Sequence, residues 1–241
     1  MCNNLIKIPS LDINLITMKK ITILFFAFIS ISMISQNTIT KEVGDFNELK
    51  VYDLIEINLI QSSENKVVIK GKNTSSVKII NQNGKLKIRM PIEERFDGSQ
   101  TFIEVYFKNI DIIDANEGAV IVANKLIEQN TIELRSQEGA KIKVGLKVNH
   151  TTIKAVSGGI VEASGLSTSQ EISLNSGGIF EGRELKTQDT KIGITAAGEA
   201  DIFASNKVDV KVTAGGNVSI YGNPKNVTEK KLAGGRIRIM N

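Results

Sequence analysis

Acidic residues recur at matching positions of a repeated pattern in the second half of this 241-residue chain. Glu117 and Glu138 each precede a glycine of the pattern, and Glu162 and Glu181 each follow one by four residues. Paired carboxylates can hydrolyse glycosidic bonds, and stacked carboxylates can attract a cation such as Ca²⁺. No Asp-rich motif accompanies either pair, so we interpret both as solvated surface charge. We predict no metal site, with Glu117 and Glu138 as the candidates if a cation binds.

Other catalytic chemistry has little support in the sequence. His150 is the only histidine, and zinc sites need several Cys or His ligands. The recurrent glycines are not phosphate-binding loops, because such loops lead into a helix N-terminus and no segment with helical periodicity follows them. We therefore predict no catalytic residue, no cofactor and no enzymatic activity.

The glycine-centred pattern itself is a repeat. Its seven glycines are Gly118, Gly139, Gly158, Gly177, Gly198, Gly215 and Gly234. They are spaced by 17 to 21 residues. A turn residue at near-constant spacing indicates a solenoid, in which each coil buries its apolar face against its neighbours.

Apolar residues occupy fixed positions around these glycines. Ile113 lies five residues before the first one and Ile121 three residues after it, and later units follow the same pattern. A third apolar column contains Leu126, Leu146, Leu166, Leu185 and Val208. Three inward columns predict an all-β, parallel β-helix with coils of about 19–20 residues, three short strands each and a triangular cross-section. The unit of Gly198 fits only with one inserted residue, so we expect a bulge at its corner.

The region before the repeats has a different sequence pattern. Residues 54–59, 67–70, 77–80, 86–90 and 101–107 alternate apolar and polar side chains, as half-buried strands do. Asn83-Gly84 predicts a tight hairpin, and residues 93–100 predict an exposed loop. We expect residues 36–109 to form a strand region that covers one end of the stack, and residues 110–241 to form the repetitive coils.

The start of the chain predicts export. Lys19 and Lys20 follow Met18 and precede a short apolar run, which together predict a signal peptide over residues 18–35. The run is too short for a spanning helix, so we expect no permanent membrane span after cleavage. Residues 1–17 lack this pattern and are interpreted as an extension before the true start. Cys2, the only cysteine, lies in that extension, so the mature chain has no disulfide.

Composition limits the partners. Without residues 1–35 the chain has 27 basic and 25 acidic residues. A near-neutral balance without a basic stripe or interleaved aromatics argues against nucleic acid. Glycan recognition by ring stacking has only Tyr52, Tyr106 and Tyr221 to draw on, since the chain has no tryptophan. Binding of a sugar through polar side chains stays open.

The chain resembles a family of exported bacterial proteins described as putative auto-transporter adhesin, head GIN domain. Residues 54–61, 67–71, 214–224 and 233–237 carry the resemblance, which extends from Phe46 to Met240. It implies a single-stranded right-handed β-helix. The family usually has Ser-Gly-Ser-Gly at its corners, whereas Glu-Gly-Ala and Ala-Gly-Gly replace several of them here.

Our leading hypothesis is an exported, non-enzymatic β-helix protein of the cell envelope. Its long faces would mediate adhesion to a macromolecule or glycan of the envelope or surface. The alternatives are a polysaccharide-active enzyme that uses surface carboxylates, and a structural spacer or assembly subunit, for which an oligomer is an option. We expect the protein in the periplasm, at the outer-membrane surface or outside the cell.

Overall fold

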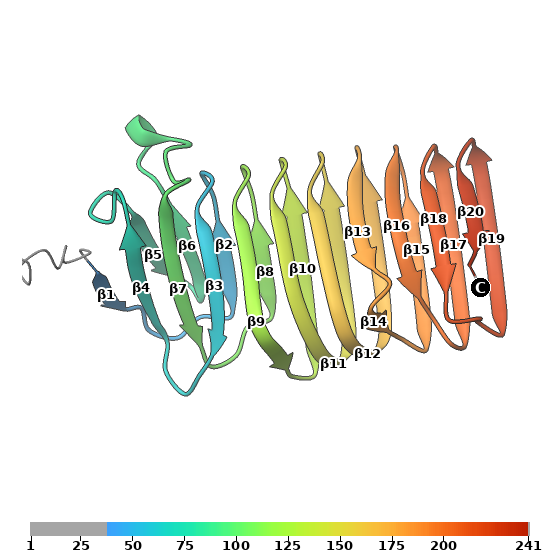
Figure 1. Cartoon of the computed structure of the whole chain (residues 1–241), viewed down its shortest axis with the longest axis horizontal. Helices are drawn as coiled ribbons and strands as arrows, with labels where there is room; N and C mark the ends of the chain where they lie inside the picture. Colours follow the sequence, from blue (N-terminus) through green and yellow to red (C-terminus); the bar gives the residue numbers. More distant parts are fainter. Residues whose placement is uncertain (1–37, 241) are drawn as a thin grey trace, which may run out of the picture. The chain divides into compact units, whose positions relative to one another are not determined.

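The computed structural model describes residues 38–240, which belong to one compact unit, Asn37–Asn241. The described residues form twenty strands of a single sheet and one 3₁₀ turn, η1 (Ile92–Glu94). The predicted all-β solenoid is confirmed (Figure 1). The predicted extension over 1–17 and signal peptide over 18–35 lie outside the described residues. Within residues 38–240, no helix is long and apolar enough to cross a bilayer.

Each coil has two long sides, on either side of the glycine corner. We call the side that precedes the corner the pre-corner face and the side that follows it the post-corner face. The pre-corner face contains β8 (Ile112–Ala115), β10 (Thr131–Gln137), the second halves of β11 (Lys141–Val156) and β12 (Ile160–Asn175), β15 (Asp189–Ile194), β17 (Lys207–Ala214) and β19 (Asn226–Ala233). The post-corner face contains β9 (Val120–Glu128), the first halves of β11 and β12, β13 (Gly178–Gly182), β14 (Leu185–Lys186), β16 (Gly198–Phe203), β18 (Asn217–Tyr221) and β20 (Arg236–Ile239).

Successive coils pair in parallel and in register, so identical positions stack. On the post-corner face Ile121 pairs with Ile142, which pairs with Val161. On the pre-corner face Leu134 pairs with Ile153. All five side chains are fully buried, and burying each stabilises the fold by about 1.5–3 kcal/mol. Because β-branched residues suit a pleated, half-buried surface, the repeat can fill its core with short aliphatic side chains.

The first four corners, from Glu117-Gly118 to Ser176-Gly177, are turns with two consecutive residues of positive φ. Glu117 (51°) precedes Gly118 (70°), and Glu138 (56°) precedes Gly139 (72°). A turn with both central residues left-handed is of type I′, which favours glycine because it has no Cβ. Gly118 N–H donates to Glu138 O of the next coil (3.0 Å). The corners therefore continue the hydrogen-bond ladder between coils.

The corner of the fifth unit lies at Ala197, so the alignment on Gly198 was wrong. Ala197 has a φ of 44°, and its carbonyl accepts the Gly177 N–H (2.7 Å). Gly198 instead begins β16, opposite Gly178. An alanine can take this left-handed position at a steric cost of about 1–2 kcal/mol, which the surrounding ladder offsets.

The inserted residue of this region lies before the corner, not at it. Glu162 pairs with Glu181, 19 residues along the chain, whereas Gly165 pairs with Leu185, 20 residues along. The chain therefore gains its extra residue between β13 and β14. The expected insertion exists, but on the post-corner face of the preceding coil.

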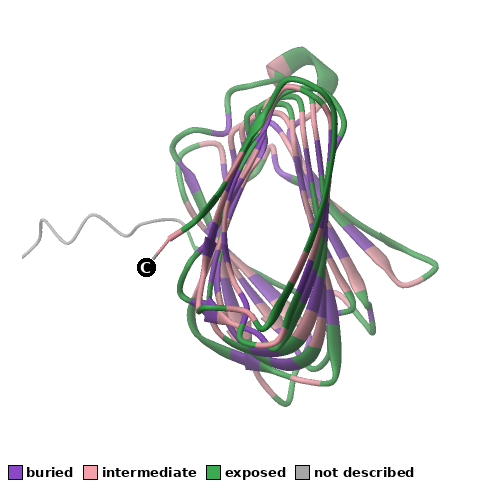
Figure 2. Ribbon diagram, turned by 90° about the vertical axis from the view of Figure 1, so that its right-hand side faces the viewer, coloured by how far each residue is buried: buried purple, intermediate pink, exposed green. Residues whose placement is uncertain are grey.

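The third apolar column is only partly correct. Leu146, Leu185 and Val208 are fully buried, but Leu126 and Leu166 are 48% and 57% exposed. β9 shifts register against β11 before Leu126, and Gly165 has a φ of 100°, so both leucines turn outward. Figure 2 looks along the stack and shows an elongated ring with two long sides instead of a triangle. The 16-residue strands β11 and β12 pass through the closing bend without a break.

The N-terminal strands cover one end of the stack, as predicted. They are β1 (Ile39–Glu42), β2 (Glu48–Val51), β3 (Glu56–Gln61), β4 (Lys66–Gly71), β5 (Lys78–Gln82), β6 (Lys85–Arg89) and β7 (Thr101–Phe107). We call this region the cap. β4 and β5 pair antiparallel with β7 and β6, which ends the parallel stack. The hairpin between β5 and β6 turns at Asn83 (φ 53°) and Gly84 (φ 75°), as the sequence predicts.

The order of the cap strands in space differs from their order in the chain. β2 pairs with both β6 and β8, and β3 pairs with both β7 and β9. The β2–β3 coil therefore lies between the later β6–β7 coil and the first repeat. The segment between β7 and β8 crosses this inner coil, where Asn47 O accepts the N–H groups of Asp111 (2.7 Å) and Ile112 (3.1 Å).

The exposed edge of the last coil carries charged side chains. Arg236 and Arg238 on β20 are exposed, as predicted. Glu229 and Lys231 on β19 pair with the inward positions of Val210 and Val212 in the coil before. Charges at inward positions of an edge strand oppose the addition of another strand.

Candidate functional site

The predicted cation candidates lie on adjacent corners. The hydrogen bond between Gly118 and Glu138 confirms that the two coils stack here. The Glu117 carboxylate, however, forms an ion pair with Arg95 from the cap, while Glu138 is exposed. In residues 38–240, no group of three or more His, Cys, Asp or Glu side chains is arranged to hold a metal ion. The absence of a metal site, with Glu117 and Glu138 as the candidates if a cation binds, stays a prediction.

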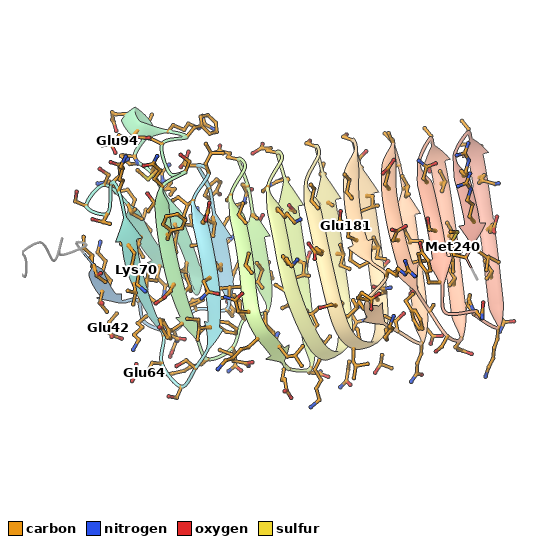
Figure 3. All side chains as sticks on the ribbon, viewed as in Figure 1. Glu42, Glu64, Lys70, Glu94, Glu181 and Met240 are labelled. Carbon is orange, nitrogen blue, oxygen red and sulfur yellow. The ribbon has the colours of Figure 1, made fainter. Side chains whose placement is uncertain are left out.

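The second acidic pair belongs to a longer column on the post-corner face. Glu162 pairs with Glu181, which pairs with Asp201 on the next coil. The sequence alignment missed Asp201 because it placed the corner at Gly198. Figure 3 shows Glu181 on this face, in the middle of the stack. Lys141 and Lys143 compensate the start of the column, with Nζ–Oε distances of 3.2 and 2.6 Å to Glu162.

The pre-corner face has the same arrangement of charges. Glu133 accepts hydrogen bonds from Arg135 in its own strand (2.8 Å) and from Lys154 in the next coil (2.7 Å). Lys191 reaches back to Glu171 of the preceding coil (2.8 Å). Both faces are thus covered by short-range pairs of opposite charge.

These pairs set the protonation of the carboxylates. The hydrogen bond from Arg135 lowers the pKa of Glu133, although partial burial opposes the shift. The hydrogen bonds from Lys143 and then Lys141 lower the pKa of Glu162, again against burial. The hydrogen bond from Lys191 lowers the pKa of Glu171. A general acid of a glycosidase needs a raised pKa, so these three residues are poorly suited to that role.

His150 is part of a polar row on the pre-corner face. Its Nδ1 lies 2.8 Å from the Ser169 hydroxyl of the next coil, and its Nε2 lies 3.4 Å from Thr152 Oγ1. The ring is half-buried and has hydroxyl groups on both sides. This environment fits a structural role for the side chain.

A hollow with a volume of about 530 Å³ lies at the cap. We call it the cap hollow. Its lining includes three cations, two acids and a set of apolar or amide side chains: Lys87, Arg89 and Arg95; Asp53 and Glu117; and Tyr52, Ile80, Gln82, Met90 and Ile92. Side chains of β5 and β6, together with Tyr52 just after β2, form its floor, and the loop of residues 91–100 forms a wall.

Asp53 fixes that loop. Its carboxylate is buried and accepts the N–H groups of Met90 (3.0 Å) and Phe96 (3.3 Å). Its backbone carbonyl accepts the Gly98 N–H (3.1 Å), and any Cβ at Gly98 would collide with that carbonyl. Arg95 then extends from the loop to Glu117. The hollow is therefore built by hydrogen bonds between the loop and the β2–β3 corner.

The charge balance of the cap hollow differs from that of the two faces. Lys87 and Arg89 form no ion pair with any residue from 38 to 240. Lys78 pairs with Arg89 across the β5–β6 ladder and likewise has no acidic partner among the described residues. Ile80, opposite Lys87, is 42% exposed. The floor thus combines uncompensated cations with exposed apolar surface.

The sequence analysis did not identify this hollow. It treated the loop as exposed and the strand 86–90 only as part of the end cover. One available signal was the alternation of Lys85, Lys87 and Arg89, which places three cations on the same side of a strand. The position of the loop above them depends on Asp53, which no local pattern reveals.

Three comparisons relate the chain to known proteins. The family model described as "Putative auto-transporter adhesin, head GIN domain" matches residues 45–224. A comparison with curated proteins finds no match. A putative adhesin from Bacteroides fragilis NCTC 9343 superposes with a TM-score of 0.78 at 14% identity, over 84% of this chain and 96% of that one.

Two further solved structures cover 85% of this chain and 96% of their own. A putative adhesin from Parabacteroides merdae ATCC 43184 has a TM-score of 0.64 at 18% identity. A putative lipid binding protein from Parabacteroides distasonis ATCC 8503 has a TM-score of 0.65 at 12% identity. At these identities the likeness shows the shared fold.

Proposed function

Because the chain belongs to the auto-transporter adhesin, head GIN domain family, we propose that it is an exported, non-enzymatic β-solenoid protein of the cell envelope. It binds another macromolecule or a glycan of the envelope through its surface. The family and two structural neighbours, each named a putative adhesin, support this role.

The observation that carries the proposal is the pairing of charges along both faces. Glu133, Glu162 and Glu171 each lie within 3.2 Å of a lysine or arginine. A rigid surface with regularly alternating charge and few net charges suits broad contact with a polar partner. The same ion pairs leave these carboxylates ionised near neutral pH.

The polysaccharide-active alternative would use the column of Glu162, Glu181 and Asp201. Stacked acids in a parallel β-solenoid lie roughly 5 Å apart, which is close to the carboxylate spacing of retaining glycosidases. The lowered pKa of Glu162 argues against its service as the proton donor. We therefore favour binding over hydrolysis.

A fractionation and binding assay tests the proposal. The full sequence is expressed in its native host with an affinity tag at its C-terminus, and the envelope and culture medium are assayed separately. We expect the protein in an exported fraction and retained on isolated envelope or host-surface glycans, without release of reducing ends. Retention in the cytoplasm, or catalytic release of reducing ends, would contradict the proposed function.

A further inference from the structure

We propose that the cap hollow is a binding site for an acidic saccharide, one that carries carboxylates as uronic acids do. The proposal rests on the proposed function and deepens it by naming the ligand class and the residues that bind it. Lys87 and Arg89 bind the carboxylate, and the surrounding side chains contact the sugar.

The two cations are placed to act together. Lys87 and Arg89 are alternate residues of β6, so their side chains project from the same side of the strand, with Cα atoms roughly 7 Å apart. Both line the hollow. The guanidinium of Arg89 can bind a carboxylate through two parallel hydrogen bonds, and the ammonium of Lys87 adds a point charge. Asp53 and Glu117 also line the hollow, but Asp53 is buried and hydrogen-bonded to the loop, and Glu117 is paired with Arg95. An anionic ligand would pair with the two remaining cations, Lys87 and Arg89.

The rest of the lining suits a sugar ring. Gln82 offers an amide for hydroxyl groups, while Tyr52 and Ile80 offer surface for the C–H groups of the ring. Ile92 extends this apolar surface on the loop side and is 74% exposed. A volume of about 530 Å³ lies within the usual range of small-ligand sites. Since only one aromatic residue lines the hollow, recognition depends on charge and hydrogen bonds more than on stacking.

The surroundings disfavour two other anionic partners. Glu93 and Glu94 lie beside Ile92 in η1, and this loop projects beyond the corners of the cap strands (Figure 3, where Glu94 is labelled). A flat anionic bilayer would meet these carboxylates before it reached Lys87 and Arg89. Single-stranded nucleic acid prefers a basic groove with several aromatic platforms. A narrow saccharide chain can enter the hollow beside the loop.

The test uses the protein expressed from the full sequence and two matched variants. Lys87→Gln/Arg89→Gln removes both cations from the hollow. Lys211→Gln/Lys230→Gln removes the same charge from the distant pre-corner face, where both lysines are exposed. Trigalacturonate is the acidic probe and maltotriose the neutral one, and binding is measured by calorimetry at low and high salt.

We expect the wild type to bind trigalacturonate but not maltotriose, with weaker binding at high salt. The hollow variant should lose about tenfold or more in affinity, because two charge-assisted contacts disappear, and the control variant should match the wild type. Circular dichroism checks that both variants keep the β fold. Arg89→Lys should bind at an intermediate affinity, because it keeps the charge but not the bidentate geometry.

Three outcomes would overturn the inference. The first is failure of the wild type to bind trigalacturonate while it is still retained on envelope extract, which leaves the proposed function standing. The second is equal loss in the hollow and control variants, which would indicate a general charge effect. The third is binding to phosphatidylglycerol vesicles that depends on Lys87 and Arg89 without saccharide binding, which would make the hollow a lipid site.

Discussion

The cap and the coils belong to the same sheet but differ in strand pairing, in chain order and in the pairing of charges. In the coils each strand pairs with the equivalent strand one repeat away, each corner contains a residue of positive φ, and Glu133, Glu162 and Glu171 each have a basic neighbour. In the cap, antiparallel strands end the ladder, a later coil lies outside an earlier one, and two cations of the hollow, Lys87 and Arg89, have no acidic partner among the described residues. Regularity gives the coils two even faces, and the departure from it gives the cap a hollow.

The cap and the coils should also differ in how a substitution affects local stability. In a solenoid, stability is the sum of coil and nearest-neighbour contributions. A change in a coil should therefore act on that coil and its neighbours, whereas a change at Asp53 should act on the loop and hollow of the cap. Four experiments follow from this difference, in order of decreasing effect.

Truncation of a core aromatic should cause the largest loss. Phe180 points inward from β13 and is 1% exposed. Phe180→Ala should lower the free energy of unfolding by about 3–5 kcal/mol, because it leaves a cavity between coils. Urea unfolding measures the loss, and hydrogen exchange locates it. We expect faster exchange in β12, β13 and β16 than in the cap, and equal acceleration in β4 and β5 would show that cap and coils unfold as one unit.

Two glycines of the corners should respond differently to alanine. A Cβ at Gly178 would collide with the carbonyl of Ala155 in the preceding coil, whereas a Cβ at Gly158 has nothing within 4 Å. Gly178→Ala should therefore cost about 1–3 kcal/mol by overpacking. Gly158→Ala, at a φ of 74°, should cost only the left-handed strain of about 1 kcal/mol. If thermal melting ranks the two variants in the opposite order, the close approach of coils at Gly178 does not limit packing.

Loss of the Asp53 carboxylate should release the loop of the cap. Asp53→Ala leaves the N–H groups of Met90 and Phe96 without their acceptor, which costs about 1–3 kcal/mol. Hydrogen exchange of residues 91–100 should accelerate while β15 and β17 stay protected. Glu93→Ala, in the same loop but exposed, is the control and should change neither. Unchanged exchange in Asp53→Ala would mean that other contacts hold the loop.

The smallest effect concerns pH. The folded-state pKa values of Glu133 and Glu162 lie below their ordinary values, so their ion pairs stabilise the fold above the unfolded pKa near 4.5. That stability is lost as the pH falls through the folded pKa. Each partly exposed pair contributes about 0.2–1 kcal/mol. Urea midpoints should therefore drop on acidification, and Glu133→Gln should reduce the drop, whereas a wild-type midpoint independent of pH would contradict this assignment.

Much of the architecture was predictable because equivalent positions of neighbouring repeats contact one another in a solenoid. The spacing of Gly118 and Gly139 predicts the corners, and the apolar positions around them predict the columns that Ile121 and Ile142 occupy. The errors arose where the repeat length changes. Ala197 took a glycine position, and Gly165 turned Leu166 outward, because hydrogen bonds between coils fix the register more strongly than the type of one residue does.

The candidate sites were less predictable for the same reason. Adjacency of Glu162 and Glu181 follows from the repeat, but the lysines that compensate them were not assigned. Lys143 is one coil away, and only the register brings it within 2.6 Å of Glu162. The cap hollow depends on residues far apart in the chain, such as Asp53 and Phe96, so no short pattern could indicate it.

By itself the sequence determined a stacked, glycine-cornered β-solenoid with a distinct strand region at its N-terminal end, because periodic side chains can bury themselves only against equivalent neighbours. Only the tertiary structure decided that each coil has two long sides and that β2–β3 lies inside β6–β7. It also decided that Lys87 and Arg89 line a hollow in which neither forms an ion pair. These features depend on which strands meet across long separations in the chain, and such pairings are set by the packing of the whole sheet.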